Sequence, residues 1–198
     1  MRKTIMLFVT GVSLLVLISH SVAIENSPPN MYAPFDLYRL RGSMDMTPAL
    51  PYEIEPIDFK PFVDGRNWIV RGTLRYWIGN SQDYTTVPKG FVTDFASIPP
   101  KLKSFIQQNS PLLLPAVMHD YLYWKQTCTR KQADKILRLA MIEHHVPETQ
   151  RIAIYQALRI ARGSAWNENA QNRRAGMVRI LPTDRQKITA RTLWPSYQ

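Results

Sequence analysis

The feature that most constrains the fold is a long helical pattern in residues 112–161, where apolar side chains recur every three or four positions. Two positions divide this stretch: Thr129, a residue type that favours a helix N-cap, and Pro147, after which a new helix can begin. Gly163 is a good stop at its end. The pattern therefore predicts three helices, at about residues 113–124, 129–145 and 148–162.

The segment before this stretch reads as β-structure. Trp68 to Ile78 is rich in β-forming residues and predicts one strand, and Tyr84 to Val87 predicts a second. Residues 79–83 between them are typical turn residues. We therefore expect an α+β fold, in which a small antiparallel β-sheet packs on a three-helix unit.

Cysteine usage shows how such a fold must be held together. Cys128 is the only cysteine, which excludes intramolecular disulfides and Cys-rich zinc or iron–sulfur sites. Five Trp, nine Tyr and seven Phe supply enough apolar surface for a folded core. We expect side-chain packing alone to stabilise the chain.

The N-terminus has the composition of an export signal. Arg2 and Lys3 precede an apolar run from Ile5 to Ile18, and small residues follow at Ser21 and Ala23. The run is shorter than the roughly 20 residues of a membrane-spanning helix, which favours cleavage after Ala23 over an uncleaved anchor. We therefore expect a periplasmic or secreted protein.

The rest of the chain divides by composition. The region after the signal peptide holds seven of the 15 prolines and reads as an extended arm, which can dock on the body through Phe35 to Tyr38 and Ile54 to Ile57. The C-terminal residues are mostly basic and read as a loosely attached tail. The expected regions are a signal peptide (1–23), a Pro-rich arm (24–63), a core domain (64–166) and a basic C-terminal tail (167–198).

The chain carries a formal charge of +10, of which Arg2 and Lys3 belong to the expected signal peptide. In an exported protein, this positive charge favours an anionic membrane surface or a cell-wall polymer as partner over nucleic acid.

Two segments place ionisable residues among apolar neighbours. Asp94 lies in a short apolar segment, and His119 and Asp120 lie in the first expected helix. Buried acids and imidazoles are costly unless they are paired or bound to a metal. Tyr123 follows His119 by one helical turn, and Asp134 begins the next helix, where it can approach an antiparallel His119. We expect Asp94, His119, Asp120 and Asp134 to meet in a polar cleft.

Three separated motifs in this region resemble one known family. They are Val87 to Pro99, the string His119-Asp120-Tyr121-Leu122-Tyr123, and Thr129 to Asp134 followed by Met141. Together they resemble the phage and bacterial family called domain of unknown function 1353, over roughly residues 68–166. This resemblance implies a family domain and says little about activity.

The helix motif alone is also similar to the secreted phospholipase A2 group, whose helix carries His-Asp-x-x-Tyr. That resemblance implies that His119 is the general base, that Asp134 orients it, and that Tyr123 belongs to the catalytic set. It also implies that Asp120 and Asp94 bind calcium, which would polarise an ester carbonyl.

Two hypotheses follow. The first is a metal-assisted hydrolase that acts on a cell-envelope component, either a phospholipid ester or a wall polymer such as peptidoglycan. The second is a non-catalytic envelope or phage-derived module, in which the same polar residues only fix the loop to the helix. An enzyme requires Asp134 on one nitrogen of His119 and an open cleft at the other, whereas a structural histidine is sealed in the core.

Overall fold

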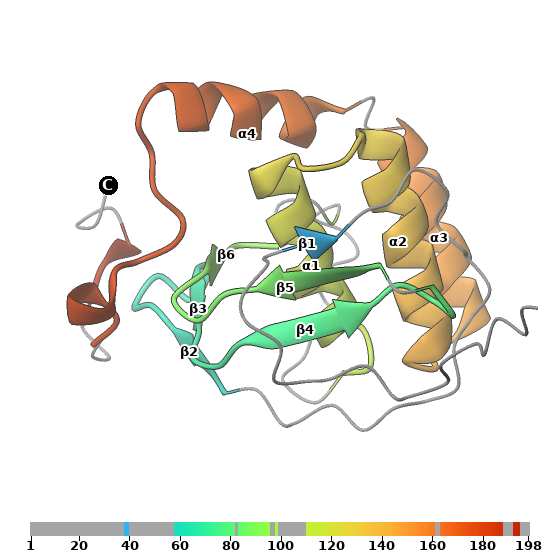
Figure 1. Cartoon of the computed structure of the whole chain (residues 1–198), viewed down its shortest axis with the longest axis horizontal. Coiled ribbons are helices and arrows are strands. Elements are labelled where there is room, and N and C mark those ends of the chain that lie inside the picture. Colours follow the sequence, from blue (N-terminus) through green and yellow to red (C-terminus); the bar gives the residue numbers. More distant parts are fainter. Residues whose placement is uncertain are drawn as a thin grey trace, which may run out of the picture. The chain divides into compact units, whose positions relative to one another are not determined.

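The computed structural model describes residues 38–39, 58–81, 83–95, 98, 110–160, 163–187 and 192–194. The expected signal peptide and most of the Pro-rich arm lie outside these residues. In the described part of the chain, no helix is long and apolar enough to cross a membrane. The elements form an α+β fold, as the sequence predicts (Figure 1).

The strands form two antiparallel three-stranded sheets, in the orders β1-β5-β4 and β2-β3-β6. Tyr76 faces Thr85 across the first sheet, and Ile69 faces Val92 across the second. The strands are β1 (Tyr38–Arg39), β2 (Phe59–Pro61), β3 (Trp68–Val70), β4 (Leu74–Trp77), β5 (Tyr84–Val87) and β6 (Val92–Thr93).

The single strand expected from Trp68 to Ile78 is wrong in one respect, because the segment forms two strands in different sheets. Gly72 lies at the break, between the exposed Arg71 and Thr73. A glycine offers no side chain to pack in a strand and often marks a bend. Docking of the arm is confirmed at Tyr38, which pairs with Thr85 in β5, whereas the second stretch, Ile54 to Ile57, lies outside the described residues.

The three expected helices are confirmed, and a fourth follows them. Thr129 caps its helix through a capping box. Its side chain accepts a hydrogen bond from the backbone N–H of Gln132, and the side chain of Gln132 accepts one from the backbone N–H of Thr129. A left-handed residue, Gln126, ends the first helix. The helices are α1 (Leu113–Lys125), α2 (Arg130–Glu143), α3 (Glu148–Ile160) and α4 (Ser164–Arg174), followed by the short 3-10 turn η2 (Thr183–Arg185).

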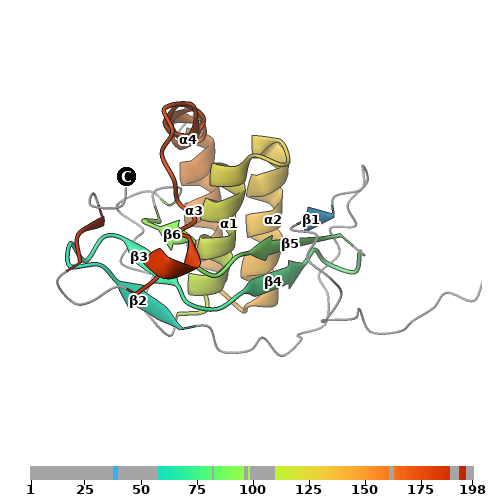
Figure 2. The ribbon, with the colours of Figure 1, turned by 60° about the vertical axis from the view of Figure 1, so that its left-hand side comes forward.

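Helix α1 is the centre of the structure. It packs against α2 and α4 and contacts the sheets through β5 and β6 (Figure 2). Nearly all of its residues are buried, including Tyr121, whose ring meets the edge of Phe91 at a centroid distance of 5.3 Å. The polar residues of α1 are therefore buried because the apolar residues beside them pack into the core.

The expectation of a loosely attached tail is wrong for the described C-terminal residues. Arg173 of α4 donates to the carbonyl oxygen of Lys125 and to the side chain of Gln126. Further on, Leu181 and Trp194 are buried in a second apolar cluster, together with Phe62, Ile69 and Val92. A few apolar residues attach this segment to the rest of the domain. The average composition of the segment is basic and does not reveal them.

Candidate functional site

His119 and Asp120 occupy adjacent positions of α1 and reach two different polar networks. Successive helical residues point about 100° apart, so the two side chains leave the helix on different faces. Both are buried, with exposed fractions of 0% for His119 and 1% for Asp120. The single cleft expected to gather four residues is thus divided into two networks.

The first network joins α1 to α2 through Asp134. Nε2 of His119 lies 3.1 Å from Oδ1 of Asp134, and the hydroxyl of Tyr123 donates to the same oxygen at 2.6 Å. Arg130, one turn before Asp134, donates to its other oxygen at 3.3 Å. The structure therefore brings together the three residues expected to form the catalytic set, and adds Arg130.

Hydrogen bonding sets the charge states in this network. Burial alone raises the pKa of Asp134, but hydrogen bonds from His119 and Tyr123 outweigh it and hold the pKa below the ordinary 3.8. Burial and the bond to Asp134 raise the pKa of Tyr123 far above its ordinary value, so its hydroxyl remains a donor. Asp134 is an ionised acceptor at neutral pH, which assigns a proton to Nε2 of His119.

The second ring nitrogen of His119, Nδ1, differs from Nε2 in its hydrogen bonding. Nδ1 is buried and has no hydrogen-bond partner among the described residues. A buried polar atom without a partner costs about 1–3 kcal/mol, and such atoms occur at catalytic sites or where a small polar molecule binds. One half of the expected enzyme geometry is therefore present, whereas the open cleft at this nitrogen is not.

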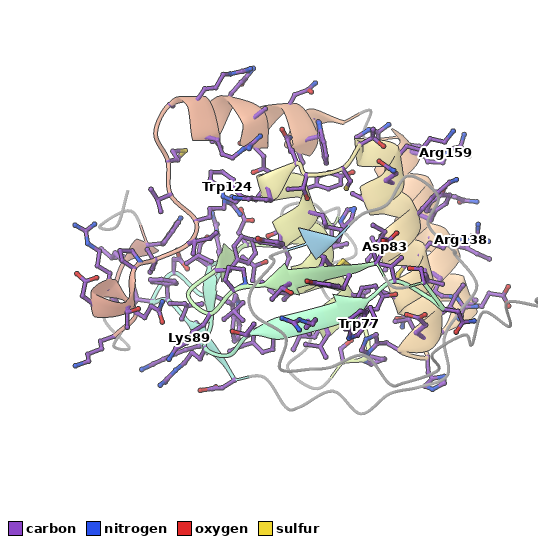
Figure 3. The ribbon with its side chains drawn as sticks, in the orientation of Figure 1. Trp77, Asp83, Lys89, Trp124, Arg138 and Arg159 are labelled. Atoms are coloured by element: carbon purple, nitrogen blue, oxygen red, sulfur yellow. The ribbon has the colours of Figure 1, made fainter. Side chains whose placement is uncertain are left out.

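The second network joins the Asp94 segment to α1 through Arg179. Arg179 donates to both oxygens of Asp94, at 2.8 and 3.2 Å, and its guanidinium lies 3.7 Å from Oδ2 of Asp120. Thr93 donates to Oδ2 of Asp120 at 2.7 Å. The guanidinium also lies over the ring of Trp124, 5.5 Å from its centroid, at the end of α1 (Figure 3). The two carboxylates expected to share calcium thus share an arginine.

Arg179 stays protonated because of its two acidic neighbours. Burial alone lowers its pKa, but Asp120 and Asp94 together raise it above the ordinary value. Its side chain is 15% exposed, so the ion pairs are partly shielded from water.

This arrangement does not fit a calcium ion. Calcium takes six to eight oxygen ligands, but both oxygens of Asp94 are already bound by a guanidinium. In the described part of the chain, no group of three or more His, Cys, Asp or Glu side chains could hold a metal.

Sequence reasoning missed the two arginines of these networks. Arg130 has a local signal, because it precedes Asp134 by four residues and so shares its helix face. Arg179 has none, since 85 positions separate it from Asp94 in the chain. Thr93 also belongs to the second network, because its hydroxyl donates to Asp120.

The fold and these networks define an α+β domain built around a buried His-Asp-Tyr set on two antiparallel helices. Residues 68–158, a little under half of the chain, match the family described as "Protein of unknown function (DUF1353)". This confirms the first resemblance seen in the sequence. No curated protein and no solved structure matches the chain.

Proposed function

We propose that this domain is a hydrolase in which His119 is the general base, and that it cleaves an ester of a cell-envelope component. The observation that carries the proposal is the one-sided bonding of His119. Asp134 holds Nε2 at 3.1 Å, whereas the buried Nδ1 has no partner in the described structure. The lone pair on Nδ1 is then available to accept a proton from water.

The chemistry of the other residues is consistent with this step. As Nδ1 takes the proton of an attacking water, the ring becomes an imidazolium, and the Asp134 carboxylate stabilises its charge. Tyr123 fixes the carboxylate by donating to the same oxygen. Arg130 keeps Asp134 ionised, because a neighbouring cation favours the charged carboxylate.

The substrate class rests on the sequence. The expected export signal, and the charge of +8 that remains once Arg2 and Lys3 are removed with it (10 − 2), favour a substrate at an anionic surface outside the cytoplasm. A phospholipid ester is the most specific candidate, since the His-Asp-x-x-Tyr helix resembles that of secreted phospholipases. A wall polymer such as peptidoglycan is the other substrate that fits this location.

The complete burial of His119 favours a second candidate function, a non-catalytic envelope module. There the two networks would only fix α2 and the Asp94 segment to α1. For a hydrolase, the residues around His119 must move enough to admit water and an ester. The two candidates therefore differ in whether His119 reacts at all.

The test is fatty-acid release from anionic phospholipid vesicles, with hydrolysis of purified peptidoglycan as a second substrate arm. We expect the wild type to act on one of them, and His119→Ala to lose at least about a hundredfold in rate, as for loss of a general base. His145→Ala is the matched control, because His145 is exposed beyond the end of α2, and should leave the rate unchanged. Equal rates for His119→Ala and wild type, or no activity on either substrate, would favour the non-catalytic module.

A further inference from the structure

A separate site lies away from the His119 network, in a surface pocket of about 390 Å³. It is open to solvent and collects cationic side chains from parts of the chain that are distant in sequence. Its charged and polar lining is Lys60, Arg71, Lys89, Thr183, Gln186 and Lys187.

The pocket is built by the backbone around Gly90. The N–H of Gly90 donates to the carbonyl oxygen of Val70 at 2.7 Å, and its own carbonyl oxygen accepts from Leu181 at 2.9 Å. Gly90 has a φ of +88°, and a Cβ there would lie 2.7 Å from the backbone carbonyl oxygen of Leu181. Only glycine allows the C-terminal segment to close on this turn and complete the pocket.

The lining is positively charged. Lys89 and Lys187 both line the pocket and are exposed, and they come from segments that are distant in the sequence. Arg71 has an acidic neighbour in Asp58, at 3.5 Å, but both side chains are about half exposed or more, so the pair is weak. Like charges gathered around one hollow repel each other, and an anion placed between them relieves this repulsion.

Gln186 lines the pocket with an amide side chain of which only one end is hydrogen-bonded. Its Nε2 donates to the carbonyl oxygen of Leu181 at 2.8 Å, which fixes the orientation of the amide. Its Oε1 is buried and has no hydrogen-bond partner in the described structure. Gln186 lines the pocket, so a ligand whose binding displaces the atoms that cover this oxygen would bring a hydroxyl donor to it.

We propose that this pocket binds a phosphate group that carries a neighbouring hydroxyl, the chemistry of a glycerol phosphate. The phosphate lies among the cations, and the hydroxyl donates to Oε1 of Gln186. This site is independent of the proposed hydrolysis, because it uses none of the residues around His119.

The test is calorimetric titration with glycerol 3-phosphate. We expect saturable binding by the wild type, weakened at least about tenfold in the double variant Lys89→Glu/Lys187→Glu. The matched control is Lys131→Glu/Lys135→Glu, which changes the charge equally at exposed positions of α2. Figure 3 shows Lys89 far from Arg138 of this helix. The control should bind as the wild type does, and so should His119→Ala.

Further arms identify the source of the phosphate. Competition between glycerol 3-phosphate and phosphatidylglycerol vesicles indicates a lipid headgroup, whereas binding of the soluble ester without vesicle binding indicates a free phosphate ester. Gln186→Leu should reduce the preference for glycerol 3-phosphate over inorganic phosphate. The proposal is overturned if the wild type shows no saturable binding, if both double variants weaken it equally, or if the wild type binds inorganic phosphate as tightly as the glycerol ester.

Discussion

At the scale of single residues, Asp134 is the residue that joins the first network. It accepts from His119, Tyr123 and Arg130 while only 6% of its surface is exposed. Sequence reasoning could anticipate the pairing with His119, because helical spacing and antiparallel packing place the two residues opposite each other. It could not anticipate Arg179, whose place depends on how the distant C-terminal segment returns to the domain.

Replacing Asp134 by Asn should destabilise the fold. The amide keeps the shape but loses the charge, and its NH₂ group cannot accept, so we expect a loss of about 1–3 kcal/mol in the free energy of unfolding. Urea denaturation measures this loss. Asp184→Asn, at an exposed position of η2, is the matched control and should change the free energy by less than about 0.5 kcal/mol. Equal effects of the two changes would contradict the role of Asp134.

The stability difference between the wild type and Asp134→Asn should depend on pH. Because folding lowers the pKa of Asp134 below 3.8, its ionised form stabilises the native state at pH values above 3.8. This contribution is lost as the pH falls through the lowered pKa. The stability difference between wild type and Asp134→Asn should therefore be constant near neutral pH and shrink in acid. A difference that grows in acid would show that the pKa is raised instead.

Arg179 should determine whether the second network binds calcium. Arg179→Gln leaves Asp94 and Asp120 without their cation, and we expect a loss of up to about 3 kcal/mol, less than for a fully buried pair. The freed oxygens, with the hydroxyl of Thr93, then suit calcium. Millimolar calcium should raise the melting temperature of this variant and leave the wild type and the control Arg174→Gln unchanged. A shift of equal size in all three proteins would contradict the assignment of Arg179.

At the scale of elements, the sequence predicts the helices well and the sheets only in outline. The helices follow from local signals, such as the Thr129 cap and the apolar spacing that continues after Pro147. The division of the strand at Gly72 is not local, because it depends on which partner each half finds: β2 and β6 for the first half, β5 for the second. The attachment of the C-terminal segment depends likewise on contacts far along the chain, such as that of Trp194 with Phe62.

The attachment can be tested at Trp194. This side chain is 6% exposed and its ring meets Phe62 at a centroid distance of 5.4 Å. Trp194→Ala should lower the free energy of unfolding by about 3 kcal/mol and make the C-terminal segment more sensitive to proteolysis. Leu193→Ala is the neighbouring control, because Leu193 is 52% exposed, and should have little effect. Equal effects of the two changes would show that the segment is not held through Trp194.

At the scale of the whole molecule, charge and burial are distributed unequally. The acidic residues expected to form the site are neutralised by arginines near α1, whereas the lysines of the pocket lie on another part of the surface. The proposed phosphate binding and the proposed proton transfer at His119 therefore use different parts of the domain. Variants of the pocket and of His119 should therefore be separable, each altering one property and leaving the other.

The most direct test of the central claim is the position of the proton on the His119 ring, measured by nitrogen-15 NMR on histidine-labelled protein. The spectrum of His119→Ala identifies the resonances. We predict that the neutral ring carries its proton on Nε2, facing Asp134, and that Nδ1 carries none and can accept one. A neutral ring with its proton on Nδ1 would contradict the account, because that nitrogen would then be a donor and could not serve as a base.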